Sequence, residues 1–226
     1  DEPRSRLARL RPDGSLDTTF APIELGSPGW DYIETLLVQL DGKILIGGGF
    51  FTVNGVARGK LARLHADGTV DDTFRPVVTS GREVTAMALQ PDGKLIVAGD
   101  FSIVRGAESI DTQRFSLARF HPDGTLDAGF APAIVSFGTS PGDVNTLALD
   151  TLGQLYIGGS FSQVGGQPRE NMARLLPDGT VDPVFAPDFD SGVRCLVLEA
   201  GGTVLVAANE AWGLPTRWPP SDPDAL

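Results

Sequence analysis

The sequence contains few of the side chains on which nucleophilic and metal chemistry depends. Cys195 is the one cysteine in 226 residues, so no internal disulfide can form and the redox compartment is undetermined. Equivalent positions of the repeat described below hold threonine or alanine, which predicts that Cys195 is a small buried filler. Both histidines, His65 and His121, stand just before a turn in equivalent segments, which does not favour a general base or a metal ligand. No nucleophile motif, phosphate-binding loop or Cys/His cluster occurs.

Basic residues are also few, with 18 Lys and Arg against 29 Asp and Glu, and the net charge is -11. Such a field repels phosphate backbones and anionic lipid headgroups, so neither nucleic acid binding nor membrane insertion is expected. No stretch reaches the roughly 20 apolar residues of a membrane span. Residues 1–4 contain neither an initiator Met nor a signal-peptide core, which fits either a mature chain or one cut from something longer.

Glycine and proline are abundant instead, with 28 and 17 residues. This composition suits many short strands joined by tight turns better than long helices. The hydrophobic content of 41% is enough to fill a core. The expected class is therefore all-β.

One segment recurs four times. Leu-Ala-Arg-Leu at residues 7–10 returns at 61–64 and, with one substitution, at 117–120 and 172–175, at spacings of 54, 56 and 55 residues. Each copy continues through an Asp-Gly pair and a second Asp to a Phe. A fixed period of this length marks a repeat architecture. The copies span approximately residues 7–60, 61–116, 117–171 and 172–210 of a single repeat domain, 1–226, which ends in an irregular Pro-rich segment at 211–226.

Each copy predicts two β-hairpins. The first follows from Ala-Arg-Leu, which alternates at the strand period before the Asp-Gly turn. In the second, the returning strands are apolar runs at residues 44–46, 95–97, 155–157 and 204–206, which predicts burial on both faces. Two small residues follow each run, and Phe50, Phe101 and Phe161 come next and should pack between units, whereas the fourth copy has Glu210 there. Four strands per repeat predict a β-propeller, or a propeller arc, of four ~55-residue units.

The pattern resembles a known family. Gly-Gly-x-Phe, Ala-Arg-Leu, Pro-Asp-Gly-Ser/Thr-Leu/Val-Asp and x-x-Phe-x-Pro, over about residues 4 to 210, are similar to the delta-60 repeats. These are predicted β-propeller modules of large, mostly bacterial, secreted or surface proteins. The resemblance implies a propeller architecture and an extracellular or cell-surface setting, and it implies no general activity.

Two arrangements of the ends are open. The first and last hairpins could pair and close a ring of four blades, or the chain could be an open arc from a longer array. An open arc would leave an unpaired strand edge that is prone to association. The missing Met and the long arrays of the family favour the arc.

The polar residues that recur in every copy are expected to serve the blade. Paired acids such as Asp13 and Asp17 could suggest calcium, but a calcium site needs six to eight oxygens and no third acid is in register. We expect the first Asp to make the turn and the second to bind backbone N–H groups or a recurring arginine. The recurring arginines are Arg9, Arg63, Arg119 and Arg174, with a second column at Arg58. No metal or cofactor is expected.

Function is better sought where the copies differ at one structural position. One column holds Tyr32, Glu83, Asp143 and Gly192, a second holds Glu34, Thr85, Asn145 and Arg194, and a third holds Gly49, Asp100, Ser160 and Asn209. If these columns open on one face, Glu83, Asp100 and Asp143 would form an acidic rim for a polar ligand or a cation, with Trp30 and Tyr32 as a stacking surface. Solvated loop residues would explain the same variation. A polar insertion at residues 107–113 is either a recognition loop or neutral drift.

The leading hypothesis is a non-catalytic propeller module, a scaffold or interaction surface of a larger secreted or surface protein. Its partner would be a protein or a polysaccharide. The alternative is a propeller that binds or cleaves carbohydrate through the acidic rim. Glycosidases need two carboxylates that face the sugar, and Glu83 with Asp143 is the pair that could serve. No catalytic residue is otherwise predicted, so the chain is not expected to be an enzyme.

Overall fold

All the strands of the described chain pair antiparallel, in several small β-sheets. The computed structural model describes residues 6–26, 31–136 and 142–209. Three sheets share one plan, in which an inner strand pairs with a middle strand and the middle strand pairs with an outer one. They are β2 (Tyr32–Val38), β3 (Ile44–Gly49) and β6 (Leu61–Leu64); β7 (Val77–Leu89), β8 (Leu95–Arg105) and β10 (Leu117–Phe120); and β12 (Asp143–Leu149), β13 (Leu155–Ser160) and β16 (Met172–Leu175). The all-β propeller class predicted from the repeat is confirmed.

The fourth strand of each blade is reduced to a single bridge. Leu64 pairs with Val70, Phe120 with Leu126 and Leu175 with Val181, each just beyond an Asp-Gly turn. The fourth unit has two strands in the described residues, β17 (Val193–Leu198) and β18 (Val204–Ala208). No helix in the described ranges is long and apolar enough to cross a membrane.

The blades are out of phase with the sequence copies. The outer strand β6 begins the second copy but pairs with β3 of the first, with Leu45 opposite Arg63. The same exchange joins β8 to β10 and β13 to β16. Each blade therefore takes its two inner strands from one copy and its outer strands from the next, which links neighbouring copies through backbone hydrogen bonds.

A small second sheet lies beside each blade, and the sequence patterns did not predict it. β1 (Leu25–Gly26), β4 (Thr52–Val53) and β5 (Val56–Ala57) form the first, and β11 (Ile134–Val135), β14 (Gln163–Val164) and β15 (Gln167–Pro168) form the third. In the second unit β7 and β8 extend to take this place, and β9 (Asp111–Gln113) joins them. The signal for these sheets in the sequence was the pair of tight turns, Asn54-Gly55 and Gly165-Gly166. All four of these residues have positive φ in the structure.

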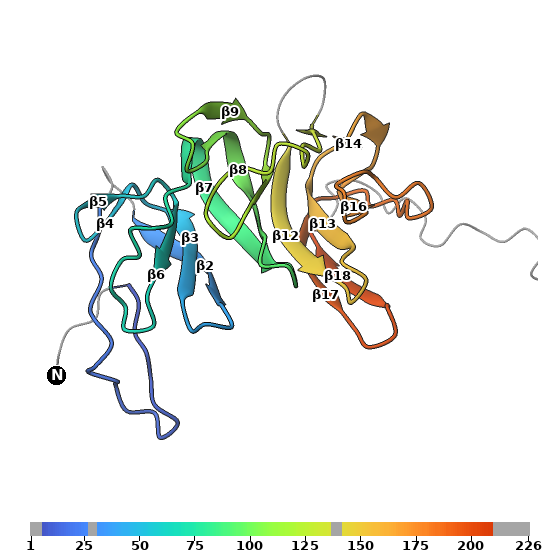
Figure 1. Cartoon of the computed structure of the whole chain (residues 1–226). Coiled ribbons are helices and arrows are strands. Elements are labelled where there is room, and N and C mark those ends of the chain that lie inside the picture. The colour runs from blue at the N-terminus through green and yellow to red at the C-terminus, as the bar shows by residue number, and fades with distance from the viewer. Residues whose placement is uncertain (1–5, 27–30, 137–141, 210–226) are drawn as a thin grey trace, which may run out of the picture.

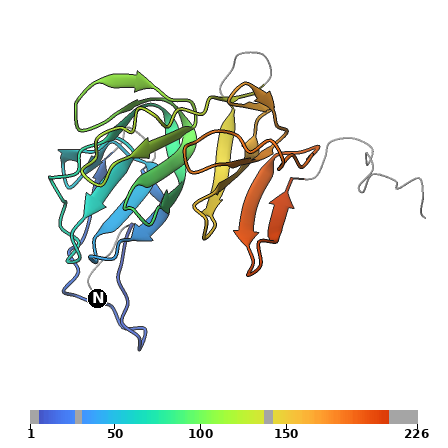
Figure 2. The same cartoon turned by 45° about the vertical axis from the view of Figure 1, so that its right-hand side comes forward.

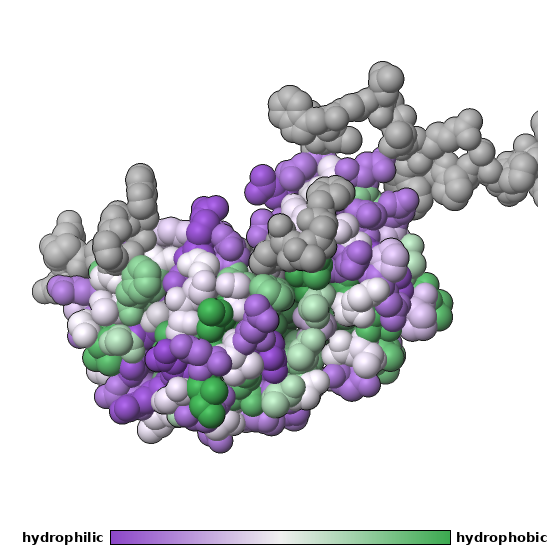
Figure 3. Space-filling model, turned by 90° about the horizontal axis from the view of Figure 1, so that it is seen from above, coloured by the Kyte–Doolittle hydropathy of each residue, from purple (hydrophilic) through white to green (hydrophobic). Residues whose placement is uncertain are grey.

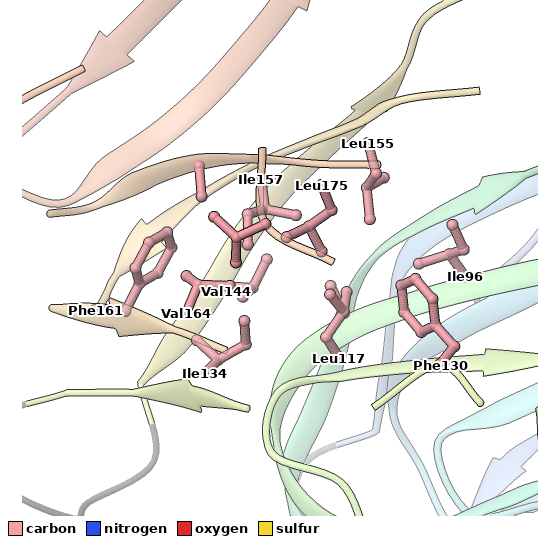
Figure 4. Packing of buried hydrophobic residues seen from close by; sticks show 13 residues of the cluster. Ile96, Leu117, Phe130, Ile134, Val144, Leu155, Ile157, Phe161, Val164 and Leu175 are labelled. Atoms are coloured by element: carbon pink, nitrogen blue, oxygen red, sulfur yellow. The ribbon is translucent and has the colours of Figure 1, made fainter. Parts of the chain in front are cut away.

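The sheets stand one behind another in a row (Figures 1 and 2). β7 lies against β2 and β3, β12 against β7 and β8, and β17 against β12 and β13. Each middle strand faces two neighbours, because Leu155 and Ile157 join the cluster toward the second blade whereas Tyr156 joins the cluster toward β17. Figure 4 shows the first of these clusters, in which Phe161 and Phe130 are buried with the aliphatic side chains. Burial on both faces is thus confirmed for residues 45–46, 95–97 and 155–157, and Ile44 at the start of its run is partly buried.

The same prediction is wrong for β18. Leu205 is 56% exposed and Val197 on β17 is 54% exposed. Cys195 is also exposed, so it is not the buried filler that its column predicted. The reason is tertiary, since no further sheet covers this face in the described part of the chain.

The recurring polar residues hold each blade together, as predicted. Arg63 Nε donates to Asp71 Oδ2 at 2.8 Å, and the guanidinium lies 4.5 Å from the centre of the Phe74 ring. Asp67 accepts the Thr69 N–H at 2.9 Å and so closes its turn. The Arg–Asp–Phe group repeats at Arg9, Asp17 and Phe20; at Arg119, Asp127 and Phe130; and at Arg174, Asp182 and Phe185.

Candidate functional site

Two of the three variable columns meet in pairs at one end of the blades. Tyr32 lies opposite Gly49, Glu83 opposite Asp100 and Asp143 opposite Ser160. The fourth pair is joined by a backbone hydrogen bond of 2.9 Å from Asn209 to Gly192. We call these eight residues the rim. The rim lies away from the Asp-Gly hairpin turns. Tyr32, Gly49, Asp143 and Ser160 stand at strand ends, whereas Glu83 and Asp100 lie within the longer strands β7 and β8. Figure 3 views the molecule from above, where hydrophilic and apolar side chains are mixed.

Tyr32 connects the first unit to the second across the rim. Its hydroxyl donates to Glu83 Oε2 at 2.5 Å. Gly49 leaves room for the ring, since a Cβ at this position would lie 2.7 Å from Tyr32 Cζ. The hydrogen bond to Glu83, together with burial, raises the pKa of the Tyr32 hydroxyl. Arg82 Nη2 lies 3.8 Å from the other carboxylate oxygen of Glu83.

The rim carboxylates share one electrostatic environment. Burial and the negative charge of Asp100 raise the pKa of Asp143, and Glu83 adds to this effect while Arg82 opposes it. The charged form of Asp143 is therefore disfavoured, and a hydrogen-bond donor or a positive charge placed here would be favoured. Lys60 belongs to the same region, because burial lowers the pKa of its amino group while the charge of Asp100 opposes this shift.

The second variable column has a structural role in two of its four copies. Glu34, Thr85, Asn145 and Arg194 each stand at a β-bulge in the inner strand. A bulge re-aims its side chain, and here the side chain reaches the next blade. Thr85 Oγ1 donates to the Val144 carbonyl at 2.7 Å, and Asn145 Nδ2 donates to the Val193 carbonyl at 2.8 Å.

A pocket of about 480 Å³ lies beside the rim, between the third unit and the segment 188–192 that leads into β17. Ser160 and Gly192 of the rim line it, together with Asn171 and the carboxylates Asp188 and Asp190. Sequence reasoning missed these last three residues. A comparison of the repeat copies could have found Asn171, because Lys60, Ser116 and Asn171 form another column that differs between copies. In the structure all three residues have positive φ.

The structure therefore brings together four of the five predicted site residues. Tyr32, Glu83, Asp100 and Asp143 meet in the rim, and Trp30 lies outside the described residues. Within the described ranges, no group of three or more His, Cys, Asp and Glu side chains is arranged to hold a metal ion.

The polar insertion of the second unit is ordered and bound to its own blade. Arg105 and Asp111 form a bidentate ion pair at 2.8 and 2.9 Å, and residues 111–113 form β9. The Ala107 N–H donates to the carbonyl of Gly124, and Glu108 accepts the Leu126 N–H at 3.3 Å. This segment is a surface extension held by hydrogen bonds at both ends.

The repeated blades and the variable rim define a β-propeller repeat protein. Residues 1–20, 39–74, 90–130 and 153–185, more than half of the chain, match the family described as "Domain of unknown function (DUF5122) beta-propeller". The chain belongs to this family. A search of curated proteins found no matching relative. One similar solved structure is the extracellular domain of a one-component system, BT4673, from B. thetaiotaomicron, with 17% identity and a TM-score of 0.48 over 80% of this chain. The match covers 21% of that chain's length.

Proposed function

We propose that this chain is a non-catalytic interaction module that binds a partner through the rim, within a larger secreted or cell-surface protein. The observation that carries the proposal is the Tyr32–Glu83 hydrogen bond of 2.5 Å between two units. Residues that the copies share hold the blades, whereas residues that differ contact one another at one end. The secreted or surface setting rests on the resemblance to repeat modules of such proteins, and fractionation of the producing cells tests it.

The chemistry of the rim favours a partner rich in hydrogen-bond donors or positive charge. Glu83 and Asp100 are cross-strand neighbours, and the pKa of Asp143 is raised first by burial and then by the negative charges of Asp100 and Glu83, so a further negative charge here is costly. A basic protein segment or a hydroxyl-rich polysaccharide would relieve this cost. Nucleic acid would increase it, because the phosphates and the net charge of -11 repel each other.

Binding arrays test the proposal directly. The protein is applied to immobilised polysaccharides and to peptides rich in lysine and arginine, beside a variant with Glu83→Gln, Asp100→Asn and Asp143→Asn. Hydrogen bonds to charged groups contribute about 1.5–3 kcal/mol each, so the variant should bind roughly tenfold more weakly or worse. Glu199→Gln, an exposed carboxylate at the opposite end, is the control and should bind like the wild type. Equal binding by the rim variant and the wild type would refute the proposal.

Carbohydrate cleavage is the second candidate, and the raised pKa of Asp143 favours it. Glycosidases use one carboxyl group that stays protonated and a second that is ionised, and Glu83 lies close enough to influence Asp143. Release of reducing sugar from polysaccharides, lost in both Asp143→Asn and Glu83→Gln, would establish this activity. We expect no release.

A further inference from the structure

A groove of about 300 Å³ lies at the outer edge of the third unit, and no rim residue lines it. Its walls are the Asp-Gly turn at residues 178–181, the preceding chain at Gly129, Ala131 and Pro132, and the hairpin of β14 and β15. We call it the outer groove. The hairpin of β14 and β15 turns through two residues, which leaves the groove open.

The chain itself fills the corresponding place in the second unit. There the hairpin of β8 and β9 turns through a longer tip, residues 106–110, which is part of the polar insertion. The tip folds over the Asp-Gly turn of its own blade. The Ala107 N–H donates to the Gly124 carbonyl at 3.0 Å, and Glu108 Oε2 accepts the Leu126 N–H at 3.3 Å.

The two backbone groups that the tip binds have counterparts in the outer groove, the Gly179 carbonyl and the Val181 N–H. In the described part of the chain neither group has a hydrogen-bond partner. The Asp182 N–H donates to the Arg174 carbonyl, so the neighbouring Val181 N–H points away from β16, toward the groove. Val181 is 7% exposed, and a main-chain N–H in such surroundings needs a partner.

The first unit closes the same place in another way. The Ala21 N–H donates to the Asp67 carbonyl at 2.6 Å, and a Cβ at Gly68 would lie 2.8 Å from the Ala21 carbonyl oxygen. The chain therefore lies directly on the turn. Ala131 holds this position in the third unit, where it lines the groove and forms no such hydrogen bond within the described ranges.

We propose that the outer groove binds a short segment of a partner protein in which a small residue is followed by glutamate. The main-chain N–H of the small residue donates to the Gly179 carbonyl, and the glutamate carboxylate accepts the Val181 N–H, as Ala107 and Glu108 do one unit earlier. A carboxylate is preferred because hydrogen bonds to an ionised acceptor are the stronger ones. The groove has the volume of a small binding site.

The acidic side chain of the groove does not oppose a glutamate here. Asp178 Oδ1 accepts the Thr180 N–H at 2.9 Å and the Thr180 hydroxyl at 2.7 Å, so it is engaged in its own turn. Asp123 makes the same two bonds to Thr125 in the second unit, where Glu108 docks beside it. Recognition thus depends on backbone groups.

A nuclear magnetic resonance titration of the isotope-labelled protein tests the proposal. The probe is the cyclised peptide Arg-Gly-Ala-Glu-Ser-Ile-Asp, the sequence of residues 105–111, whose two ends form an ion pair in the protein. It is added to millimolar concentration at physiological ionic strength, which screens the net charge of -11. The Val181 amide proton should shift downfield and saturate, whereas that of Leu126, already bonded, should not move. An unmoved Val181 amide would overturn the proposal.

Matched variants make the test specific to the groove. The peptide with Glu108→Ala should bind roughly tenfold more weakly or worse. Ala131→Trp should block the groove and abolish the Val181 shift, and a long side chain is tolerated there because Arg75 holds this position in the second unit. Arg75→Trp is the control and should bind like the wild type. The spectra report whether each variant folds, and equal binding by folded Ala131→Trp would refute the proposal.

A loop exchange provides a second variant that does not depend on a bulky side chain. Replacing Gly165-Gly166 by the sequence of residues 106–110 should close the outer groove with the chain's own Ala-Glu pair. The Val181 amide should then exchange more slowly with solvent and no longer respond to the peptide. Peptide binding equal to that of the wild type would show that the groove is not the site.

Discussion

Arg119 shows at the scale of one residue what the recurring columns do. Its Nε donates to Asp127 at 2.9 Å, its Nη1 donates to the Pro177 carbonyl at 2.7 Å, and its guanidinium lies 4.3 Å from the centre of the Phe130 ring. The side chain is therefore bound to its own blade and to the next copy. The sequence predicted the ion pair from recurrence, but the contact with the next copy depends on the packing of two sheets.

Arg119→Met should destabilise the protein strongly, because it leaves the nearly buried Asp127 carboxylate with Lys94 as its remaining cationic partner. Breaking a buried pair costs about 3–5 kcal/mol. Arg9→Met is the matched control, since the Arg9 side chain is 40% exposed and such pairs contribute about 0–1 kcal/mol. Urea unfolding of both variants measures the difference, and equal losses would contradict the role of burial.

The second aspartates should make stability depend on pH in acid. Hydrogen bonds from the Thr19 hydroxyl and N–H lower the pKa of Asp17 to about 2, from 3.8. Burial alone would raise the pKa of Asp71, but hydrogen bonds from Thr73, Lys43 and Arg63 outweigh it and the pKa is lowered. The unfolded chain then takes up protons at a higher pH than the folded one, so the stabilisation is present above pH 3.8 and is lost as the pH falls. The urea concentration at the unfolding midpoint should decrease as the pH is lowered from about 4 to about 2, and it should decrease less steeply in Asp17→Asn.

Asp143 should make the stability of the fold depend on pH in the opposite direction. Its pKa is raised by burial and by the charge of Asp100, so ionised Asp143 opposes folding above that pKa. Asp143→Asn should raise the melting temperature at neutral pH, and the gain should shrink as the pH falls and Asp143 becomes protonated. Thermal scans at several pH values measure this gain, with Glu199→Gln as the control. A lower melting temperature for Asp143→Asn at neutral pH would disprove the account.

At the scale of the element, the paired small residues shape each middle strand. The second residue of the pair lies opposite the bulge of the inner strand, where a Cβ at Gly159 would lie 1.9 Å from the Asp143 carbonyl oxygen. The small pair is visible in the sequence, which also predicted the turns and the buried runs. It did not predict the bulge or the small second sheets, since two-residue strands carry little periodicity.

Gly159→Ala should therefore destabilise more than Gly55→Ala. At Gly159 the added methyl group meets backbone that can move only if the bulge changes, whereas at Gly55 nothing lies within 4 Å and the cost is that of a φ of 76°. A left-handed conformation costs a non-glycine residue roughly 1–2 kcal/mol. Denaturant midpoints of the two variants compare the effects, and a larger loss at Gly55 would show that the contact at Gly159 is relieved cheaply.

At the scale of the whole molecule, the row of blades decides which residues are exposed and which meet. Val204–Ala208 has the same apolar character as Leu155–Ser160, yet one strand is largely exposed and the other buried, because only the second lies between two sheets. Tyr32 and Glu83 are 51 residues apart and touch because consecutive inner strands lie side by side.

The repeat in the sequence determined the class of fold, the turns, the Arg–Asp pairs and the columns where function was to be sought, because each depends on local spacing that recurs. Tertiary structure alone decided that blades combine strands from two copies and that four rim residues meet. It also decided that Asn171, Asp188 and Asp190 line a pocket and that Cys195 is exposed. These outcomes depend on which sheet lies next to which, and a repeated sequence specifies each sheet without specifying what covers the last one.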